Sequence, residues 1–245
     1  MSYKIFGLIG KDINYSFSKK YFEKKFKLIN NNNFKYENFD LKNISEVENV
    51  LVINNLCGLN VTIPYKEKII PYLDDLTPIA EEVGAVNTVY LINGKKIGDN
   101  TDVVGFQNSL NKFININPAS SIILGSGGAS KAINYVLKKQ KIKRIIVSRN
   151  PIKNQLSYEE LNEKIINENK LIINCTPLGT YPKTNEYPEI PYSFITKNHY
   201  LFDLIYNPKT TIFLKKGIDK GAKVINGFNM LIEQAEASWK IWNNI

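Results

Sequence analysis

Three glycines in the middle of the chain are spaced as in a phosphate-binding turn. The apolar stretch 121–124 runs into Gly125, Gly127 and Gly128, and helix-favouring residues follow from Ala132. In the order strand, glycine turn, helix, the backbone N–H groups of the turn and of the helix N-terminus converge on a phosphate. Gly125 lets the strand turn sharply, and Gly127 has no Cβ to keep a pyrophosphate from the backbone. The pattern G-x-G-x-x-S also occurs in ordinary connections, so alone it leaves both interpretations open.

A basic turn follows where a dinucleotide-binding unit would face the adenosine ribose. A strand pattern over 143–148 leads into Arg149 and Lys153, about 20 residues after the glycines. An acidic residue here would hold the 2′-hydroxyl of NAD, and none is present. A charge-assisted hydrogen bond of roughly 1.5–3 kcal/mol would favour the 2′-phosphate of NADP by about one to two decades. The turn therefore predicts NADP, and a solvated basic turn is the alternative.

Two serines near the N-terminus are candidates for binding a carboxylate. A strand pattern over 3–9 ends in a loop that carries Ser16 and Ser18, and a helix is predicted from Lys19 to the polar stretch 30–33. Hydroxyl donors beside a helix N-terminus attract an anion, because the donors and the local dipole point the same way. Ser18 could instead be the N-cap of the helix, whereas Ser16 is expected to have no such structural role.

The scarcity of histidine limits the acid–base chemistry that the chain can perform. The single histidine, His199, opens an apolar strand pattern, and Cys57 and Cys175 lie in apolar stretches. Serine–histidine catalysis, a metal site and a disulfide framework are therefore not expected. Proton transfer falls to Lys, Asp, Glu or Tyr.

Strand and helix patterns alternate along the whole chain, which predicts an α/β fold. Further strands are predicted at 34–41, 57–62, 171–175, 199–205 and 222–225. Helices are predicted at 44–54, from 65, and at 103–113, 132–140, 157–167, 210–220 and 230–242. Asn93-Gly94 predicts a two-residue hairpin between 86–92 and 95–97.

The composition is that of an ordinary globular chain. Its 245 residues suffice for one large or two medium domains, and 43% are hydrophobic. No apolar run approaches about 18 residues, and the first residues show no signal-peptide pattern, so a cytoplasmic location without membrane contact is expected. The net charge of +9 could serve nucleic acid. Because the lysines are dispersed among acidic residues, solvated lysines and a small anionic ligand are the preferred interpretation.

Several motifs occur together in one order. They are Gly7-Leu8-Ile9-Gly10, Ser16-x-Ser18, Asn60-Val61-Thr62-Ile63-Pro64-Tyr65-Lys66, 84–88, 98–102, the glycine turn 125–130, Asn174-x-Thr176, 203–208 and Gly227-x-x-Met230-Leu231-x-x-Gln234. In this order and spacing the chain resembles the shikimate dehydrogenase family over nearly its whole length. The resemblance implies reversible NADP-dependent oxidation of shikimate to 3-dehydroshikimate, a step of aromatic amino-acid and chorismate biosynthesis. It also implies two α/β domains, namely a substrate-binding domain (1–102 plus 227–245, with the C-terminal helix) and a Rossmann NADP-binding domain (103–226).

The resemblance also assigns roles to residues. Lys66 matches the family's proton-transfer lysine, with Asp102 as its catalytic partner, although Asp102 could also cap the following helix. The implied substrate contacts are Ser16, Ser18, Thr62, Asn87, Asp102, Tyr206 and Gln234. The implied cofactor contacts are Gly125, Ser126, Gly127, Gly128, Ala129, Ser148, Arg149, Asn150, Lys153, Leu204 and Gly227.

Some positions depart from the family pattern and leave the substrate and cofactor preferences open. These departures are Asp12, Tyr15, Lys19, Ser148, Asn150 and Asn229. The alternatives are an NAD-dependent quinate/shikimate dehydrogenase, a non-catalytic ligand-sensing relative and a basic nucleic-acid binder. Arg149 argues against NAD, and the pair Lys66 and Asp102 argues against the sensing relative. The expected partners are small molecules, with the chain as a monomer or homodimer.

Overall fold

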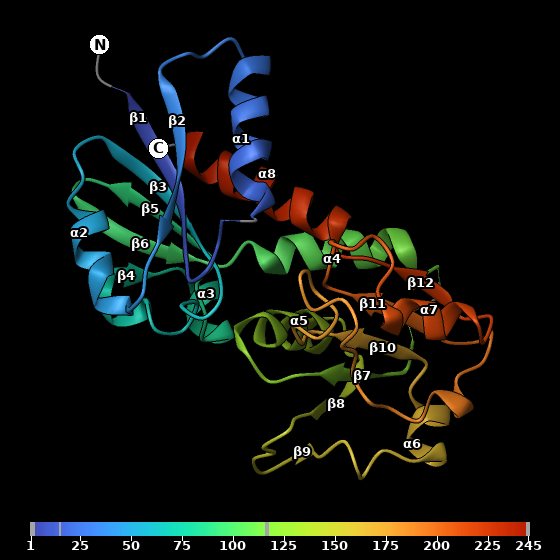
Figure 1. Ribbon diagram of the computed structural model, residues 1–245. Coiled ribbons are helices and arrows are strands. Elements are labelled where there is room, and N and C mark those ends of the chain that lie inside the picture. The colour runs from blue at the N-terminus through green and yellow to red at the C-terminus, as the bar shows by residue number, and fades with distance from the viewer. Residues whose placement is uncertain (1–2, 15, 116–117, 244–245) are drawn as a thin grey trace. The chain divides into compact units, whose positions relative to one another are not determined.

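The computed structural model describes residues 3–14, 16–115 and 118–243, and its contacts divide the chain into two compact units (Figure 1). Unit 1 contains residues 1–101 and 235–245, and unit 2 contains residues 102–234. Each unit has its own sheet flanked by helices, so the predicted α/β fold class is confirmed. The sequence places its domain boundaries after residues 102 and 226, and these boundaries stay a prediction.

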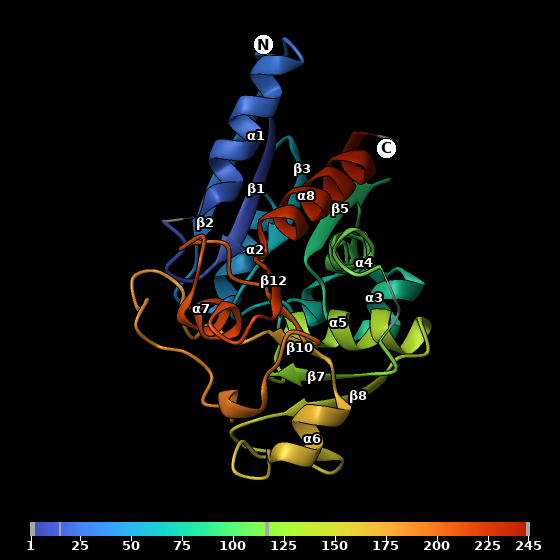
Figure 2. The same cartoon turned by 90° about the vertical axis from the view of Figure 1, so that its right-hand side faces the viewer.

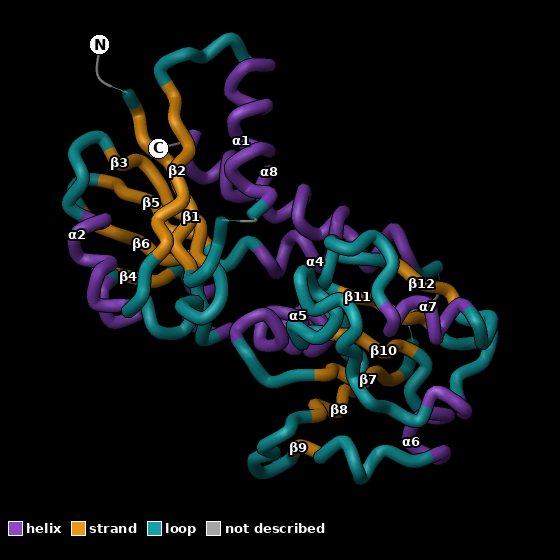
Figure 3. The backbone as a smooth tube through the Cα atoms, viewed as in Figure 1, coloured by secondary structure: helices purple, strands orange, loops and turns teal. Residues whose placement is uncertain are grey.

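Unit 1 is built on a sheet in the order β2-β1-β3-β5-β6-β4. Its strands are β1 (Lys4–Gly10), β2 (Phe34–Asp40), β3 (Leu56–Val61), β4 (Asp75–Leu76), β5 (Thr88–Ile92) and β6 (Lys95–Asp99) (Figure 3). β1 runs parallel to β2 and β3, whereas β5 is antiparallel to both β3 and β6. The β5–β6 hairpin turns at Asn93 and Gly94, with φ of 50° and 76°, as predicted for a two-residue turn.

The two faces of this sheet bury different clusters, because side chains alternate along a strand. Phe6 and Leu8 of β1 pack in one cluster with Trp242, and Ile9 packs in the other. The first face is covered by α1 (Phe17–Leu28) and by the part of α8 (Phe228–Asn243) that begins at Ala235. The second cluster involves η1 (Ile44–Glu46), α2 (Val47–Leu51), η2 (Ile70–Tyr72) and α3 (Pro78–Val83).

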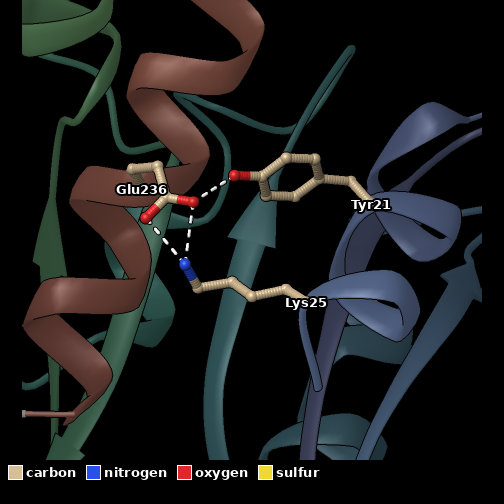
Figure 4. A network of polar contacts seen from close by, with 3 residues as sticks. All are labelled: Tyr21, Lys25 and Glu236. Carbon is tan, nitrogen blue, oxygen red and sulfur yellow. Dashed lines mark hydrogen bonds and ion pairs between the residues drawn. The ribbon is translucent and has the colours of Figure 1, made fainter. Parts of the chain in front are cut away.

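A polar contact also holds α8 against α1 (Figure 4). Glu236 accepts hydrogen bonds from the Tyr21 hydroxyl and from Lys25, whose Nζ lies 2.8 Å from Oε1 and 2.7 Å from Oε2. Burial opposes the charge on Glu236, but the hydrogen bonds from Lys25 and Tyr21 outweigh it and lower the pKa of this carboxyl. The C-terminal helix is therefore joined to unit 1 by charge as well as by apolar packing.

Unit 2 is built on six parallel strands in the order β12-β11-β10-β7-β8-β9. They are β7 (Ser120–Leu124), β8 (Lys143–Val147), β9 (Gln155–Leu156), β10 (Leu171–Asn174), β11 (Tyr200–Asp203) and β12 (Lys223–Ile225). The chain starts in the middle with β7, proceeds to one edge through β9, and returns at β10 to build the other half. This is the Rossmann order, in which ligands bind beyond the carboxyl ends of the strands where the order reverses, here β7 and β10.

The helices of unit 2 cover both faces of its sheet. They are α4 (Asp102–Phe113), α5 (Gly128–Lys139), α6 (Glu163–Glu168) and α7 (Ile212–Ile218), with η3 (Tyr192–Phe194) and the first part of α8. Figures 1 and 2 show α5 and α6 on opposite sides of β7. Phe106 of α4 meets Phe202 of β11 edge-on, with ring centroids 5.1 Å apart, which anchors α4 to the sheet.

Two predicted helices are wrong in part. No α-helix starts at residue 65, and the segment instead forms turns that end in η2, because Pro71 lacks the N–H that a helix needs. The helix predicted over 157–167 begins only at Glu163, where the Asn162 side chain accepts the Ile165 N–H as an N-cap. Among the described residues no helix is long and apolar enough to cross a membrane.

Candidate active site

The predicted substrate residues of unit 1 lie at one edge of its sheet. Ser16 and Ser18 follow the carboxyl end of β1, and Thr62 and Lys66 follow the carboxyl end of β3. Because β5 is antiparallel to β3, its amino end lies at the same edge, and Asn87 immediately precedes it. The sheet topology therefore brings together residues that are far apart in the sequence.

Backbone hydrogen bonds fix the segment that carries Lys66. The Thr62 N–H donates to the Ile9 carbonyl at 2.8 Å, and the Lys66 carbonyl accepts the Val86 N–H at 2.7 Å. The Lys66 side chain is half-buried. Lys66 is thus tied to the segment that leads directly into Asn87.

The N-cap of α1 differs from the prediction. Ser16, not Ser18, is the N-cap, and its Oγ accepts the Ser18 N–H at 3.3 Å. Ser18 lies in the first helical turn and is half-buried. Both serines remain at a helix N-terminus, the position that favours an anion.

The departures from the family pattern near this helix have local explanations. Asp12 adopts φ 55°, which proline cannot reach, and its N–H donates to Asp40 Oδ1 at 2.8 Å. Lys19 pairs with Glu37 at 2.8 Å. Tyr15 lies outside the described residues.

In unit 2 the glycine turn has the predicted form. Gly125 has φ +104°, and a Cβ there would lie 3.2 Å from Thr176 Cγ2. Gly127 is the N-cap of α5, and a Cβ there would meet nothing within 4 Å. Because packing does not require a glycine at 127, the free space suits a ligand that approaches the backbone. The first turn of α5 contains no acidic residue, so its N-terminus favours a phosphate.

The basic turn lies directly beside the glycine turn. Ser126 Oγ and Ser148 Oγ are 3.1 Å apart, and the Asn150 N–H donates to Ser148 Oγ at 3.3 Å. Arg149 and Lys153 are exposed. The residues present therefore fit a dinucleotide whose pyrophosphate lies at the glycine turn and whose 2′-phosphate meets the basic turn.

The end of β11 contains a buried carboxylate that sequence reasoning did not single out. Asp203 accepts hydrogen bonds from Thr211 Oγ1 at 2.5 Å, Asn174 Nδ2 at 3.0 Å and the Ile205 N–H at 3.0 Å. Burial raises the pKa of Asp203 to about 6, although these hydrogen bonds lower it. The carboxylate links the ends of β10 and β11 to the start of α7, and a buried Asp cannot be inferred from the motif alone.

Leu204 and Gly227 are brought together by the backbone. The Gly227 N–H donates to the Ile205 carbonyl at 3.0 Å, and a Cβ at Gly227 would overlap the Leu204 carbonyl oxygen. Only glycine fits this close approach. The two residues predicted to flank the nicotinamide are thus neighbours in unit 2.

The remaining predicted residues also belong to unit 2 by their contacts. Asp102 is buried and is the first residue of α4. Gln234 of α8 is 9% exposed, and its Nε2 donates to the Leu231 carbonyl at 2.8 Å. Tyr206 is half-buried after β11.

The single histidine lies in the buried part of unit 2, and the search for metal-ligand clusters covers residues 3–14, 16–115 and 118–243. His199 is fully buried, its Nδ1 accepts the Thr196 N–H at 3.0 Å, and its Nε2 lies 3.0 Å from the Ile166 carbonyl. Burial lowers the pKa of His199, as expected for a structural histidine. No group of three His, Cys, Asp or Glu side chains in these ranges could hold a metal ion.

The Rossmann-ordered sheet, the glycine turn and the adjacent basic turn are those of a dinucleotide-binding α/β protein. The family model for the shikimate dehydrogenase substrate binding domain matches residues 8–89. A Clostridium botulinum protein named shikimate dehydrogenase (NADP(+)) is 44% identical over 248 residues, which cover 96% of this chain and 95% of the relative. The chain belongs to the shikimate dehydrogenase family.

Solved structures agree with this assignment. A crystal structure of shikimate dehydrogenase in complex with NADP+ matches with a TM-score of 0.90 and 32% identity, covering 99% of this chain and 91% of that one. A shikimate 5-dehydrogenase from Thermus thermophilus, in complex with NADP(H) and shikimate, matches with a TM-score of 0.87 and 26% identity, covering 100% and 94%.

Proposed function

We propose that this chain catalyses the reversible, NADP-dependent interconversion of shikimate and 3-dehydroshikimate. The observation that carries the proposal is the 44% identity, over 96% of the chain, to a relative named shikimate dehydrogenase (NADP(+)). The open space at Gly127 and the exposed Arg149 support it independently of sequence identity, because they suit the two anionic parts of NADP.

On the substrate side, we assign proton transfer to Lys66, with Asp102 as its catalytic partner. When a hydride leaves a secondary alcohol, the hydroxyl proton must leave as well, and a positioned base contributes about two to four decades in rate. In the reverse direction the Lys66 ammonium returns that proton. Ser16 and Ser18 would bind the carboxylate at the N-terminus of α1. The assigned contacts to the rest of the substrate are Thr62, Asn87, Asp102, Gln234 and Tyr206.

On the cofactor side, the chemistry that NADP supplies when bound is the acceptance of the hydride. The N–H groups of the glycine turn and the N-terminus of α5 would hold the pyrophosphate, through Gly125, Ser126, Gly127, Gly128 and Ala129. The residues assigned to the 2′-phosphate are Ser148, Arg149, Asn150 and Lys153. Leu204 and Gly227 would border the nicotinamide.

The test is a steady-state comparison of the four pairs formed by shikimate or quinate with NADP or NAD. We expect kcat/KM for shikimate with NADP to exceed every other pair, by about tenfold or more over shikimate with NAD. Quinate oxidation with NAD as the preferred pair would contradict the proposal. So would turnover of neither substrate by a folded protein that binds DNA in a salt-dependent way.

The proposal includes a cytoplasmic enzyme that acts on small molecules, as a monomer or homodimer, without nucleic acid or membrane. The dispersed positive charge supports the exclusion of nucleic acid, and no helix among the described residues is long and apolar enough to cross a membrane.

A further inference from the structure

Asn87 lies beside a cluster of three buried hydroxyl groups of unit 1 and contacts two of them. Thr88 of β5, Thr101 in the loop after β6 and Ser238 of α8 lie 2.8 to 3.0 Å from one another, oxygen to oxygen. At most 2% of each residue is exposed. Three segments that are far apart in the sequence therefore meet at one polar point, which we call the hydroxyl triangle.

Two asparagine amides border the hydroxyl triangle with opposite polarity. Asn60 Nδ2 donates to Ser238 Oγ at 2.9 Å. Asn87 Oδ1 accepts the Thr101 N–H at 2.6 Å and lies 3.1 Å from each of the Thr88 and Thr101 hydroxyls. A backbone N–H can only donate, so the amide atom of Asn87 that faces Thr101 is the oxygen. The amide oxygen of Asn87 therefore faces the Thr101 N–H together with the hydroxyls of Thr88 and Thr101.

The same network extends to the buried Tyr36. Asn60 Oδ1 accepts the Tyr36 hydroxyl at 2.8 Å. Burial raises the pKa of Tyr36 well above its usual value, so the phenol stays a neutral donor. Tyr36 and Asn87 are therefore joined through buried polar groups that satisfy one another.

We propose that the hydroxyl triangle is a positioning element that holds the amide oxygen of Asn87 toward the hydroxyls of Thr88 and Thr101. The NH₂ group of Asn87 is then the group that donates a hydrogen bond to a substrate oxygen. This proposal rests on the proposed function and adds to it the direction of one substrate contact, in which Asn87 is the hydrogen-bond donor. A flipped amide would place NH₂ against the Thr101 N–H, donor against donor, and would leave buried groups unsatisfied. Thr88, Thr101 and Ser238 are positioning residues, and none of them needs to contact the substrate.

The first test removes one hydroxyl at a time. Thr101→Val keeps the β-branched shape, and Ser238→Ala removes the hydroxyl from the opposite side. We expect each to raise KM for shikimate by about tenfold, while KM for NADP changes by less than about twofold. Thr101→Ser restores the hydroxyl and should restore KM. The matched control is Ser109→Ala, because Ser109 is equally buried but its hydroxyl has no hydrogen-bond partner among the described residues.

The second test uses shikimate analogues that each lack one of the two ring hydroxyls that are not oxidised. The Thr101→Val penalty in KM should disappear for the analogue that lacks the oxygen bound by Asn87, and should persist for the other. An equal penalty for every substrate, or a penalty no larger than that of Ser109→Ala, would overturn the inference. If Thr101→Val does not fold, Ser238→Ala takes its place in the comparison. A wild-type enzyme that fails to oxidise shikimate would instead contradict the proposed function, before any variant is compared.

Discussion

The region around Asn87 and the predicted cofactor region hold their polar groups in different ways. Around Asn87 in unit 1, buried side chains bind one another, whereas Arg149 and Lys153 in unit 2 are exposed and Gly127 borders free space. Polar groups that are buried and mutually bonded are oriented before a ligand arrives. Exposed cations and an open turn obtain their partners from the ligand. We therefore expect the substrate residues to act through fixed geometry and the cofactor residues to act through charge and space.

The largest expected effect tests the chemistry assigned to unit 1. Lys66→Ala should lower kcat by about two to four decades, because the base is lost, with only a small change in KM for shikimate. Lys68→Ala is the control, since Lys68 is an exposed lysine two residues further on. Near-normal turnover of Lys66→Ala in steady-state assays would rule out its role.

Substitutions at two glycines of unit 2 distinguish a glycine that packing requires from a glycine that borders the proposed cofactor site. Gly227→Ala should destabilise the fold by on the order of 3 kcal/mol, because its Cβ would overlap the Leu204 carbonyl. Gly127→Ala should leave the free energy of unfolding within about 1 kcal/mol and raise KM for NADP by about tenfold. Urea unfolding and cofactor titration measure the two effects. A Gly127→Ala variant with unchanged KM for NADP would mean that the space at this turn does not receive the cofactor.

The buried carboxylate of unit 2 predicts a pH dependence of stability. The pKa of Asp203 is raised from 3.8 to about 6, so the unfolded state releases its proton first as pH rises. The wild type should therefore lose roughly 3 kcal/mol relative to Asp203→Asn between about pH 4 and pH 6. His199 titrates in the opposite sense, but it is present in both proteins and cancels in the difference. Urea unfolding over this pH range measures the difference in the free energy of unfolding between the wild type and Asp203→Asn. The control is Asp219→Asn, because Asp219 is exposed. A difference in the free energy of unfolding that does not change with pH would show that folding does not raise the pKa of Asp203.

The smallest expected effect tests charge at the basic turn. Arg149→Asp should lower the ratio of kcat/KM for NADP to that for NAD by about tenfold to a hundredfold. Lys164→Asp introduces the same charge change at an exposed position on α6 and should leave the ratio unchanged. If both variants shift the ratio equally, the general field of the protein selects the cofactor, not a contact at Arg149.

Local features of this fold could be predicted from the sequence, because the residues that determine them are neighbours. The glycine turn at Gly125 and the Asn93-Gly94 hairpin are examples. The local pattern alone does not identify the N-cap of α1, since Ser16 and Ser18 both fit it and the structure has Ser16 where the sequence suggests Ser18. The two-residue strand β9 is too short to leave a pattern.

Contacts between side chains that are far apart in the sequence could not be predicted. Thr88 and Ser238 are 150 residues apart, and neither segment by itself shows that their hydroxyls meet. The only signal is that Ser238 shares an otherwise largely apolar face of the last helix with Gln234. The family resemblance points to Asn87, but only the structure shows which amide atom faces inward.

The most direct test of the proposed function follows the hydride itself. Shikimate that carries deuterium on the carbon to be oxidised is incubated with NADP and the wild-type protein, and the nicotinamide product is analysed by mass spectrometry or NMR. The proposed function predicts that the deuterium appears in NADPH, in equal amount to the 3-dehydroshikimate formed. NADPH without the label, or no NADPH from a folded protein, would contradict it.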